Sequence, residues 1–160
     1  MPGRPDIAVV GGGVIGLSVA WRAAQAGMAV RLHERETSLG MLAPVAEADA
    51  QEPELLQLGL DGAERWPAFA EELREASGVD VGYRESGTLL VARDADELAW
   101  AERERDLRER LGLKAERLVG SQARGLEPGL TPRLRGAIEL ASDHSVQPRG
   151  GLAALVLACR

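Results

Sequence analysis

The sequence is poor in cysteine, in aromatic residues and in long apolar runs. Cys159 is the only cysteine among 160 residues, so no disulfide within the chain and no cysteine-based metal site can form. Aromatic residues make up 3% of the chain, too few for a base-stacking surface. No apolar run approaches the roughly 20 residues that cross a bilayer, and the N-terminus lacks the basic start and apolar core of a secretion signal. We therefore expect a cytoplasmic protein without a membrane span or a metal site.

The charged residues are mixed in sign and leave the chain acidic. There are 25 acidic and 19 basic residues, which give a net charge of −6, and they are spread along the sequence. No basic stripe of the kind that neutralises phosphates is present, so nucleic acid is not an expected partner. Apolar residues make up 45% and charged residues 28% of the chain, an ordinary globular mixture. The length suits one ordinary domain with a sizeable core.

The most informative stretch runs from Ile7 to Glu34. It begins with a continuous apolar run over 7–10, which is typical of a parallel strand covered on both faces. A glycine turn follows over 11–16, then a helix of mostly small residues to Gln25 and a second strand over 28–32. The stretch predicts a βαβ unit whose right-handed crossover places the second strand beside the first.

The glycines of this unit have the spacing of a dinucleotide-binding turn. Gly11 permits a tight turn off the strand, and Gly13 lets the backbone approach a pyrophosphate at the positive end of the helix. Gly16 lets the helix and the strand pack closely. The motif also requires a preceding strand, a following helix and an acid about 20 residues on, and all three are present. Glu34 would accept hydrogen bonds from ribose hydroxyls, which favours FAD or NAD over NADP. The alternative interpretation is a glycine-rich turn that binds no ligand.

Three segments carry a more specific pattern. They are GGGVIGLSVAW over 11–21, Glu34-Arg35, and GMLAPVAE over 40–47. Together they resemble the N-terminal half of the D-amino-acid oxidase family of flavoproteins, and within it the glycine oxidases of thiamine biosynthesis. The resemblance implies that FAD binds in an extended form. The implied contacts to its ADP half are Val14, Ile15, Glu34 and Arg35, and those beside its isoalloxazine ring are Gly40, Met41 and Leu42.

The chain departs from the family's pattern between Glu34 and Gly40. Family members carry a longer stretch there, rich in glycine, serine and alanine, whose backbone wraps the pyrophosphate and the ribityl chain. Here only residues 35–39 intervene. Donors supplied by that stretch would be missing, which bears on flavin affinity. Met41 and Leu42 also have a second interpretation, as core-filling residues after a turn.

Helices and strands alternate along the rest of the chain. Apolar stripes predict helices over 54–77 and 96–111, a short helical turn over 121–126, and a last helix that Pro148 opens. Pro67 is expected to kink or divide the first of these helices. Strands are expected over 83–92 and 137–140. His33, His144 and Arg84 are interpreted as packing or solvated residues rather than as ligands or catalysts.

The βαβ unit predicts an α/β fold. The resemblance to the family implies that this unit belongs to a Rossmann-like FAD-binding domain, and that an α+β portion of a substrate domain, built on an antiparallel sheet, is inserted in it. Residues 1–78 are expected to form the first segment of the FAD-binding domain and 79–142 a partial substrate domain. Residues 143–160 are expected to form the return helix of the FAD-binding domain. Family members continue into a third parallel strand after that helix, so the fold is expected to be truncated at its C-terminus.

The resemblance implies an FAD-dependent oxidoreductase that acts on CH–NH2 groups. Such an enzyme deaminates glycine or another small amine or amino acid by hydride transfer to FAD, and O2 takes the electrons as H2O2. Sarcosine, D-amino acids and modified nucleosides are alternative substrates within the family. The second hypothesis is a catalytically incomplete fragment that binds a dinucleotide without turnover. No catalytic residue is assigned, because the family's carboxylate-binding arginine and tyrosine have no counterpart here. A homo-oligomer is one possible assembly.

Overall fold

The computed structural model describes residues 4–33 and 42–159, which fall into two compact units. The first unit comprises Met1–Met41, Arg65–Tyr83 and Val146–Arg160, and the second comprises Leu42–Glu64 and Arg84–Ser145. The helix α2 (Pro53–Ser77) contributes residues to both units. Among the described residues, no helix has the length and the apolar composition that a membrane span requires.

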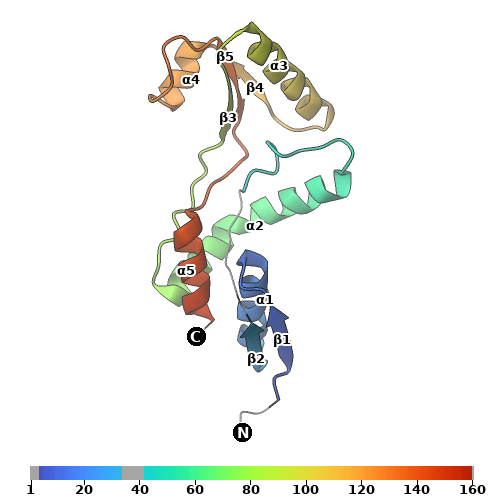
Figure 1. Ribbon diagram of the computed structural model, residues 1–160, viewed down its shortest axis with the longest axis vertical. Coiled ribbons are helices and arrows are strands. Elements are labelled where there is room, and N and C mark those ends of the chain that lie inside the picture. The colour runs from blue at the N-terminus through green and yellow to red at the C-terminus, as the bar shows by residue number, and fades with distance from the viewer. Residues whose placement is uncertain (1–3, 34–41, 160) are drawn as a thin grey trace. The chain divides into compact units, whose positions relative to one another are not determined.

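The first unit is built on a parallel pair of strands with a helix against it. The strands β1 (Ile7–Val10) and β2 (Val30–His33) are in register from Ile7 opposite Val30 to Val10 opposite His33. The helix α1 (Val14–Gln25) crosses between them and packs on both (Figure 1). Gly27 has a φ of 83°, a left-handed conformation that ends the crossover helix. The predicted βαβ unit is therefore confirmed, with the second strand starting two residues later than expected.

The expectation that β1 is covered on both faces is wrong for the residues that the structure describes. Val9 points into the core, but Ala8 is exposed and 85% of Val10 is accessible to solvent. Side chains alternate between the two faces of a strand. One face of β1 is thus buried and the other is open, because α1 supplies a single covering layer.

Helix packing forms the core of the first unit around α1. Leu17 and Trp21 are buried, and α5 (Pro148–Ala158) packs on the same helix with Leu155 in the core. Trp21 also contacts Phe69 of α2 edge to face, with ring centroids 5.6 Å apart. These apolar contacts hold α1 in place, so the orientation of its N-terminus is set by packing along its length.

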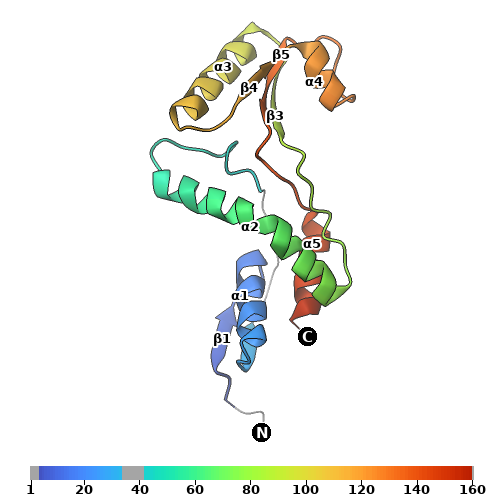
Figure 2. The same cartoon turned by 180° about the vertical axis from the view of Figure 1, so that it is seen from behind.

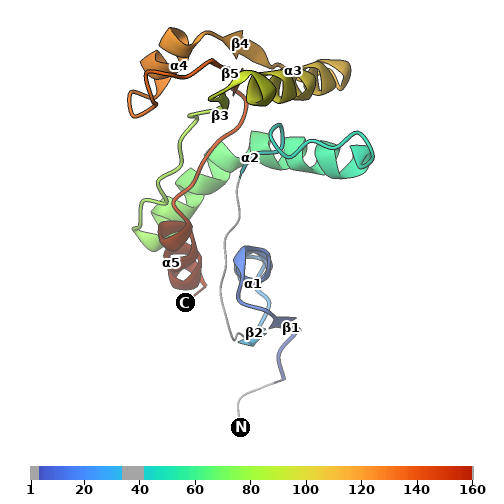
Figure 3. The same ribbon diagram turned by 45° about the horizontal axis from the view of Figure 1, so that its top comes forward.

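The second unit contains a three-stranded antiparallel sheet. The strands are β3 (Thr88–Ala92), β4 (Glu116–Leu118) and β5 (Gly136–Leu140), and β5 lies between the other two. The helices α3 (Ala95–Arg110) and α4 (Gly120–Leu126) both pack against the sheet (Figures 2 and 3). Ala101 of α3 packs with Ile138, whereas Ala123 of α4 packs with Ala137. Neighbouring residues of a strand face opposite ways, so the two helices cover opposite faces.

The structure corrects several details of the sequence prediction. The predicted strand segment around Arg84 is an isolated bridge to Ser145, and the regular strand begins only at Thr88. The short strand β4 was not predicted. The helix α2 is continuous with Pro67 inside it, so the expected division into two helices is wrong, and the expected kink stays a prediction. The α/β class with a parallel pair and a separate antiparallel sheet is confirmed. The boundaries of the FAD-binding and substrate domains stay a prediction.

Candidate cofactor-binding site at the start of helix α1

The carboxyl ends of β1 and β2 lie beside the N-terminus of α1. Val10 and His33 are the last paired residues, and the amide of Gly11 donates to the carbonyl oxygen of His33 at 2.8 Å. Gly11 then adopts a φ of 111°, a conformation that favours glycine because a Cβ would clash with the backbone. In open α/β sheets, ligands bind at the carboxyl ends of the strands. This edge is therefore the place where a ligand of the βαβ unit is expected.

Gly16 allows α1 to start very close to this turn. A Cβ built on Gly16 would lie 1.9 Å from the carbonyl oxygen of Gly11 and 3.4 Å from a methyl carbon of Val9. No side chain fits at that distance, so the predicted packing role of Gly16 matches the observed geometry. The turn and the helix can approach each other only because this position lacks a side chain.

The first turn of α1 has no side chain that competes for its amide groups. Gly13 is the N-cap, with φ −72° and ψ 178°, and no side chain caps the helix. The first turn contains no acidic residue, and the amide of Leu17 makes the first helical bond, to the carbonyl oxygen of Gly13 at 3.0 Å. The amides of Val14, Ile15 and Gly16 therefore have no acceptor within the helix. Together with the positive end of the helix dipole, they form a site suited to a phosphate group.

The structure brings together five of the ten residues predicted to bind a cofactor, namely Gly11, Gly13, Val14, Ile15 and Gly16. Glu34, Arg35, Gly40 and Met41 lie outside the described residues. Leu42 belongs to the second unit, where its carbonyl oxygen accepts from the amide of His144 at 3.0 Å.

Two buried charged residues of the second unit were missed by the sequence prediction. Arg108 is 2% exposed and Asp143 is fully buried. Both bind the backbone that follows Leu42. The only signal in the sequence was the position of Arg108 seven residues after Ala101, on the buried side of α3, where a charged residue needs partners.

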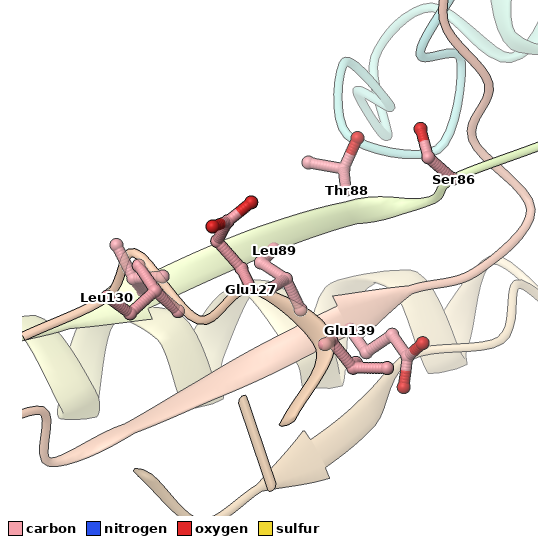
Figure 4. A pocket seen from close by; sticks show the side chains of 8 residues that line it. Ser86, Thr88, Leu89, Glu127, Leu130 and Glu139 are labelled. Carbon is pink, nitrogen blue, oxygen red and sulfur yellow. The ribbon is translucent and has the colours of Figure 1, made fainter. Parts of the chain in front are cut away.

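A hollow of about 430 Å³ lies elsewhere in the second unit, beside β3 and the loop after α4. Ser86, Thr88, Glu127 and Glu139 contribute polar groups to its lining, and Leu89 and Leu130 contribute apolar ones (Figure 4). The carboxylate of Glu127 accepts a hydrogen bond from the amide of Gly129, in the same loop, at 2.9 Å. In the described part of the chain, no group of histidine, cysteine and acidic residues could hold a metal ion.

The sequence matches the family of FAD dependent oxidoreductases (DAO) over residues 6–160. Glycine oxidase of Geobacillus kaustophilus is 32% identical over 167 residues, which cover 99% of this chain and 44% of the relative. A protein of Rhizobium etli described as the thiamine biosynthesis oxidoreductase ThiO is 34% identical, over 93% of this chain and 44% of its own length. The chain thus spans less than half the length of these relatives.

Solved structures of glycine oxidases have the same fold. The crystal structure of the Geobacillus kaustophilus enzyme superimposes with a TM-score of 0.86 over 98% of this chain and 44% of that one. The glycine oxidase of Bacillus cereus gives a TM-score of 0.82 at 30% identity, with 98% of this chain and 44% of that one covered.

Proposed function

The chain belongs to the family of FAD dependent oxidoreductases, and from this premise we propose that it supplies the ADP-binding part of a glycine-oxidase-like enzyme. FAD is the cofactor of the family. The observation that carries the proposal is the start of α1, where Gly16 lies against Gly11 and the first-turn amides have no capping side chain. A diphosphate fits such a site because it is anionic and accepts several hydrogen bonds.

The residues of the βαβ unit would hold the ADP half of FAD. The amides of Val14, Ile15 and Gly16 would donate to the pyrophosphate, and Gly11 and Gly13 would let it approach the backbone. Glu34, which follows the last residue of β2 in the sequence, would accept from the adenosine ribose, with Arg35 nearby. Gly40, Met41 and Leu42 are proposed to lie beside the isoalloxazine ring.

The proposed reaction is the oxidative deamination of glycine or another small amine. When bound, FAD supplies the acceptor for the hydride of the amine-bearing carbon, and O2 then takes the electrons as H2O2. With glycine, the product is an imine that water hydrolyses to an oxo acid and ammonia. The described residues of this chain contribute binding and orientation, and none of them is assigned to proton transfer.

The names of the relatives support the substrate class. Several matched proteins are glycine oxidases, and another is described as a thiamine biosynthesis oxidoreductase. We therefore propose glycine as the first substrate to test and thiamine biosynthesis as the setting, with sarcosine or a D-amino acid as alternatives. A cytoplasmic location and a homo-oligomeric assembly stay predictions.

A second candidate is a fragment that binds FAD without turnover. Its support is that the start of α1 offers a site for a diphosphate, whereas none of the described residues is assigned to catalysis. Peroxide formation separates the two: the chain loaded with FAD is mixed with glycine, sarcosine or D-alanine, and H2O2 is measured. Peroxide with glycine supports the oxidase, whereas bound FAD without peroxide supports the fragment.

Sequencing the gene beyond codon 160 is the companion experiment. An open reading frame that continues would allow the same peroxide assay on the longer product. Activity of that product would support the oxidase even where the 160-residue chain is inactive. A stop codon at that point, together with inactive FAD-loaded chain, would contradict it.

A further inference from the structure

The backbone from Leu42 to Ala46, here called the 42–46 segment, is held by charged side chains rather than by regular secondary structure. One carboxylate oxygen of Asp143 accepts from the amide of Val45 at 2.9 Å, and the other accepts from the amide of Ala46 at 3.0 Å. Arg108 binds the carbonyl oxygens of the same two residues. Its Nε donates to the carbonyl oxygen of Val45 at 3.0 Å and its terminal nitrogen to that of Ala46 at 2.6 Å.

The two side chains are themselves fixed in place. Arg108 also donates to the carbonyl oxygen of Glu104 at 3.0 Å and to its carboxylate at 2.6 Å. The carbonyl oxygen of Asp143 accepts from the amide of Gly87 at 2.9 Å. Both side chains are buried, where a hydrogen bond left unmade is costly. The pair Arg108 and Asp143, here called the clamp, therefore holds the backbone amides and carbonyl oxygens of Val45 and Ala46 in place.

The clamp extends to Leu42 through the next residue along the chain. His144 follows Asp143, and its amide donates to the carbonyl oxygen of Leu42 at 3.0 Å. Val45 is 1% exposed and packs with Ala101, so its side chain adds a further anchor. Leu42 is thus held directly by the amide of His144 and, through the chain, by the anchored residue Val45.

We propose that Arg108 and Asp143 are positioning residues for the flavin: by holding the peptides of Val45 and Ala46, they fix Leu42 in the place where it contacts FAD. This inference rests on the proposed function, in which Leu42 lies beside the isoalloxazine ring. A simple structural role would also need the clamp for folding. Positioning adds a requirement that the folded clamp variants bind FAD less well.

The affinity for FAD separates positioning from stability. When a chain is nearly all folded, a loss of global stability leaves the apparent Kd unchanged. A shift of the 42–46 segment away from its competent conformation raises the apparent Kd in inverse proportion to the competent fraction. Asp143→Asn replaces one acceptor oxygen by an amide donor that faces a backbone N–H. Arg108→Lys keeps the charge but removes the fork that joins two carbonyl oxygens.

The matched control is Asp94→Ala. Asp94 caps α3 in the same unit and accepts from the amide of Glu97 at 2.9 Å. The hydrogen bonds described for the 42–46 segment do not involve it. Removing this cap destabilises the second unit while leaving the clamp intact. The control therefore reports what a loss of stability alone does to FAD binding.

The experiment titrates FAD into each folded variant and records the visible absorption spectrum of the bound flavin at saturation. We expect wild type and Asp94→Ala to give the same Kd and spectrum. Both clamp variants should raise the Kd roughly tenfold, the scale of one buried hydrogen bond left unmade, and should shift the flavin absorption bands. Clamp variants that fold and bind FAD with the wild-type Kd and spectrum would overturn the inference and leave the proposed function standing.

Hydrogen exchange of the chain without FAD supplies a second readout. The amides of Val45 and Ala46 should be protected in wild type and in Asp94→Ala, and should exchange at least tenfold faster in Asp143→Asn. Equal protection in the Asp143 variant would contradict the clamp, whatever the outcome of the FAD titration. Where Asp143→Asn does not fold, Arg108→Lys carries both measurements. A folded wild-type chain that binds no FAD would overturn the proposed function, and the positioning role with it.

Discussion

Replacing Gly16 by alanine tests the close approach between α1 and the glycine turn. The new Cβ would lie 1.9 Å from the carbonyl oxygen of Gly11, whereas a carbon and an oxygen in close contact are about 3.3 Å apart. The helix would have to retreat by roughly 1.4 Å to restore that distance. It cannot do so freely, because Leu17 and Trp21 are buried along the same helix.

The expected loss of stability follows from two opposing effects. Forcing an extra carbon into a filled space costs up to about 3 kcal/mol, and alanine in a helix gains about 1 kcal/mol over glycine. The net destabilisation of Gly16→Ala is therefore up to about 2 kcal/mol, measured as the free energy of unfolding in urea. The same variant should also bind FAD less tightly, because the first-turn amides move.

Gly62→Ala is the matched control for this substitution. Gly62 also lies inside a helix, α2, but a Cβ built there meets no atom within 4 Å. The helix propensity gain should act alone, so this variant should be more stable than wild type by about 0.5 to 1 kcal/mol. If Gly16→Ala stabilises the chain as Gly62→Ala does, the packing described for the turn is wrong.

Three further predictions concern the same two units. Arg22 donates two hydrogen bonds to the carboxylate of Glu72 in an exposed ion pair, one of them at 2.6 Å. These hydrogen bonds lower the pKa of Glu72 below its ordinary 4.5. The stabilising effect of this ion pair should be present above pH 4.5 and lost as the pH falls through the lowered pKa. A double-mutant cycle should give an interaction free energy of about 0.5 kcal/mol at pH 7 and none at pH 2. The Cys159 thiol lies 3.5 Å from the carbonyl oxygen of Leu17, and burial raises its pKa. Its reaction with a disulfide reagent at pH 8 should therefore be slower than that of free cysteine, and equal rates would count against this position. Asp94→Ala should cost about 1 kcal/mol of unfolding free energy through the lost helix cap, and an unchanged urea midpoint would show that this cap is not formed.

The βαβ unit could be predicted from the sequence because its signals are local. The spacing of Gly11, Gly13 and Gly16 encodes a turn, a helix start and a close contact within a few residues, and the structure has all three. Gly27 likewise ends its helix through its own backbone conformation. The open face of β1 was not foreseen, because an apolar run such as that ending at Val10 does not say how many layers cover it.

The features that sequence reasoning missed depend on distant partners. Arg108 looks like one more charge on a polar helix, and its role appears only when Val45, 63 residues earlier, lies beside it. Asp143 binds the amide of the same residue across 98 positions. The strand β4 was missed for a related reason. Its three residues, two of them charged, form a strand only because β5 pairs with them.

FAD retention by this chain tests the central claim most directly. The folded chain is mixed with FAD or with riboflavin and passed through an ultrafiltration membrane, and the flavin retained with the protein is measured. If the first-turn amides of α1 bind the pyrophosphate, FAD will be retained, excess ADP will release it, and riboflavin, which lacks the ADP half, will pass through. Folded chain that retains no FAD, or that retains FAD and riboflavin equally and without competition from ADP, would contradict the account.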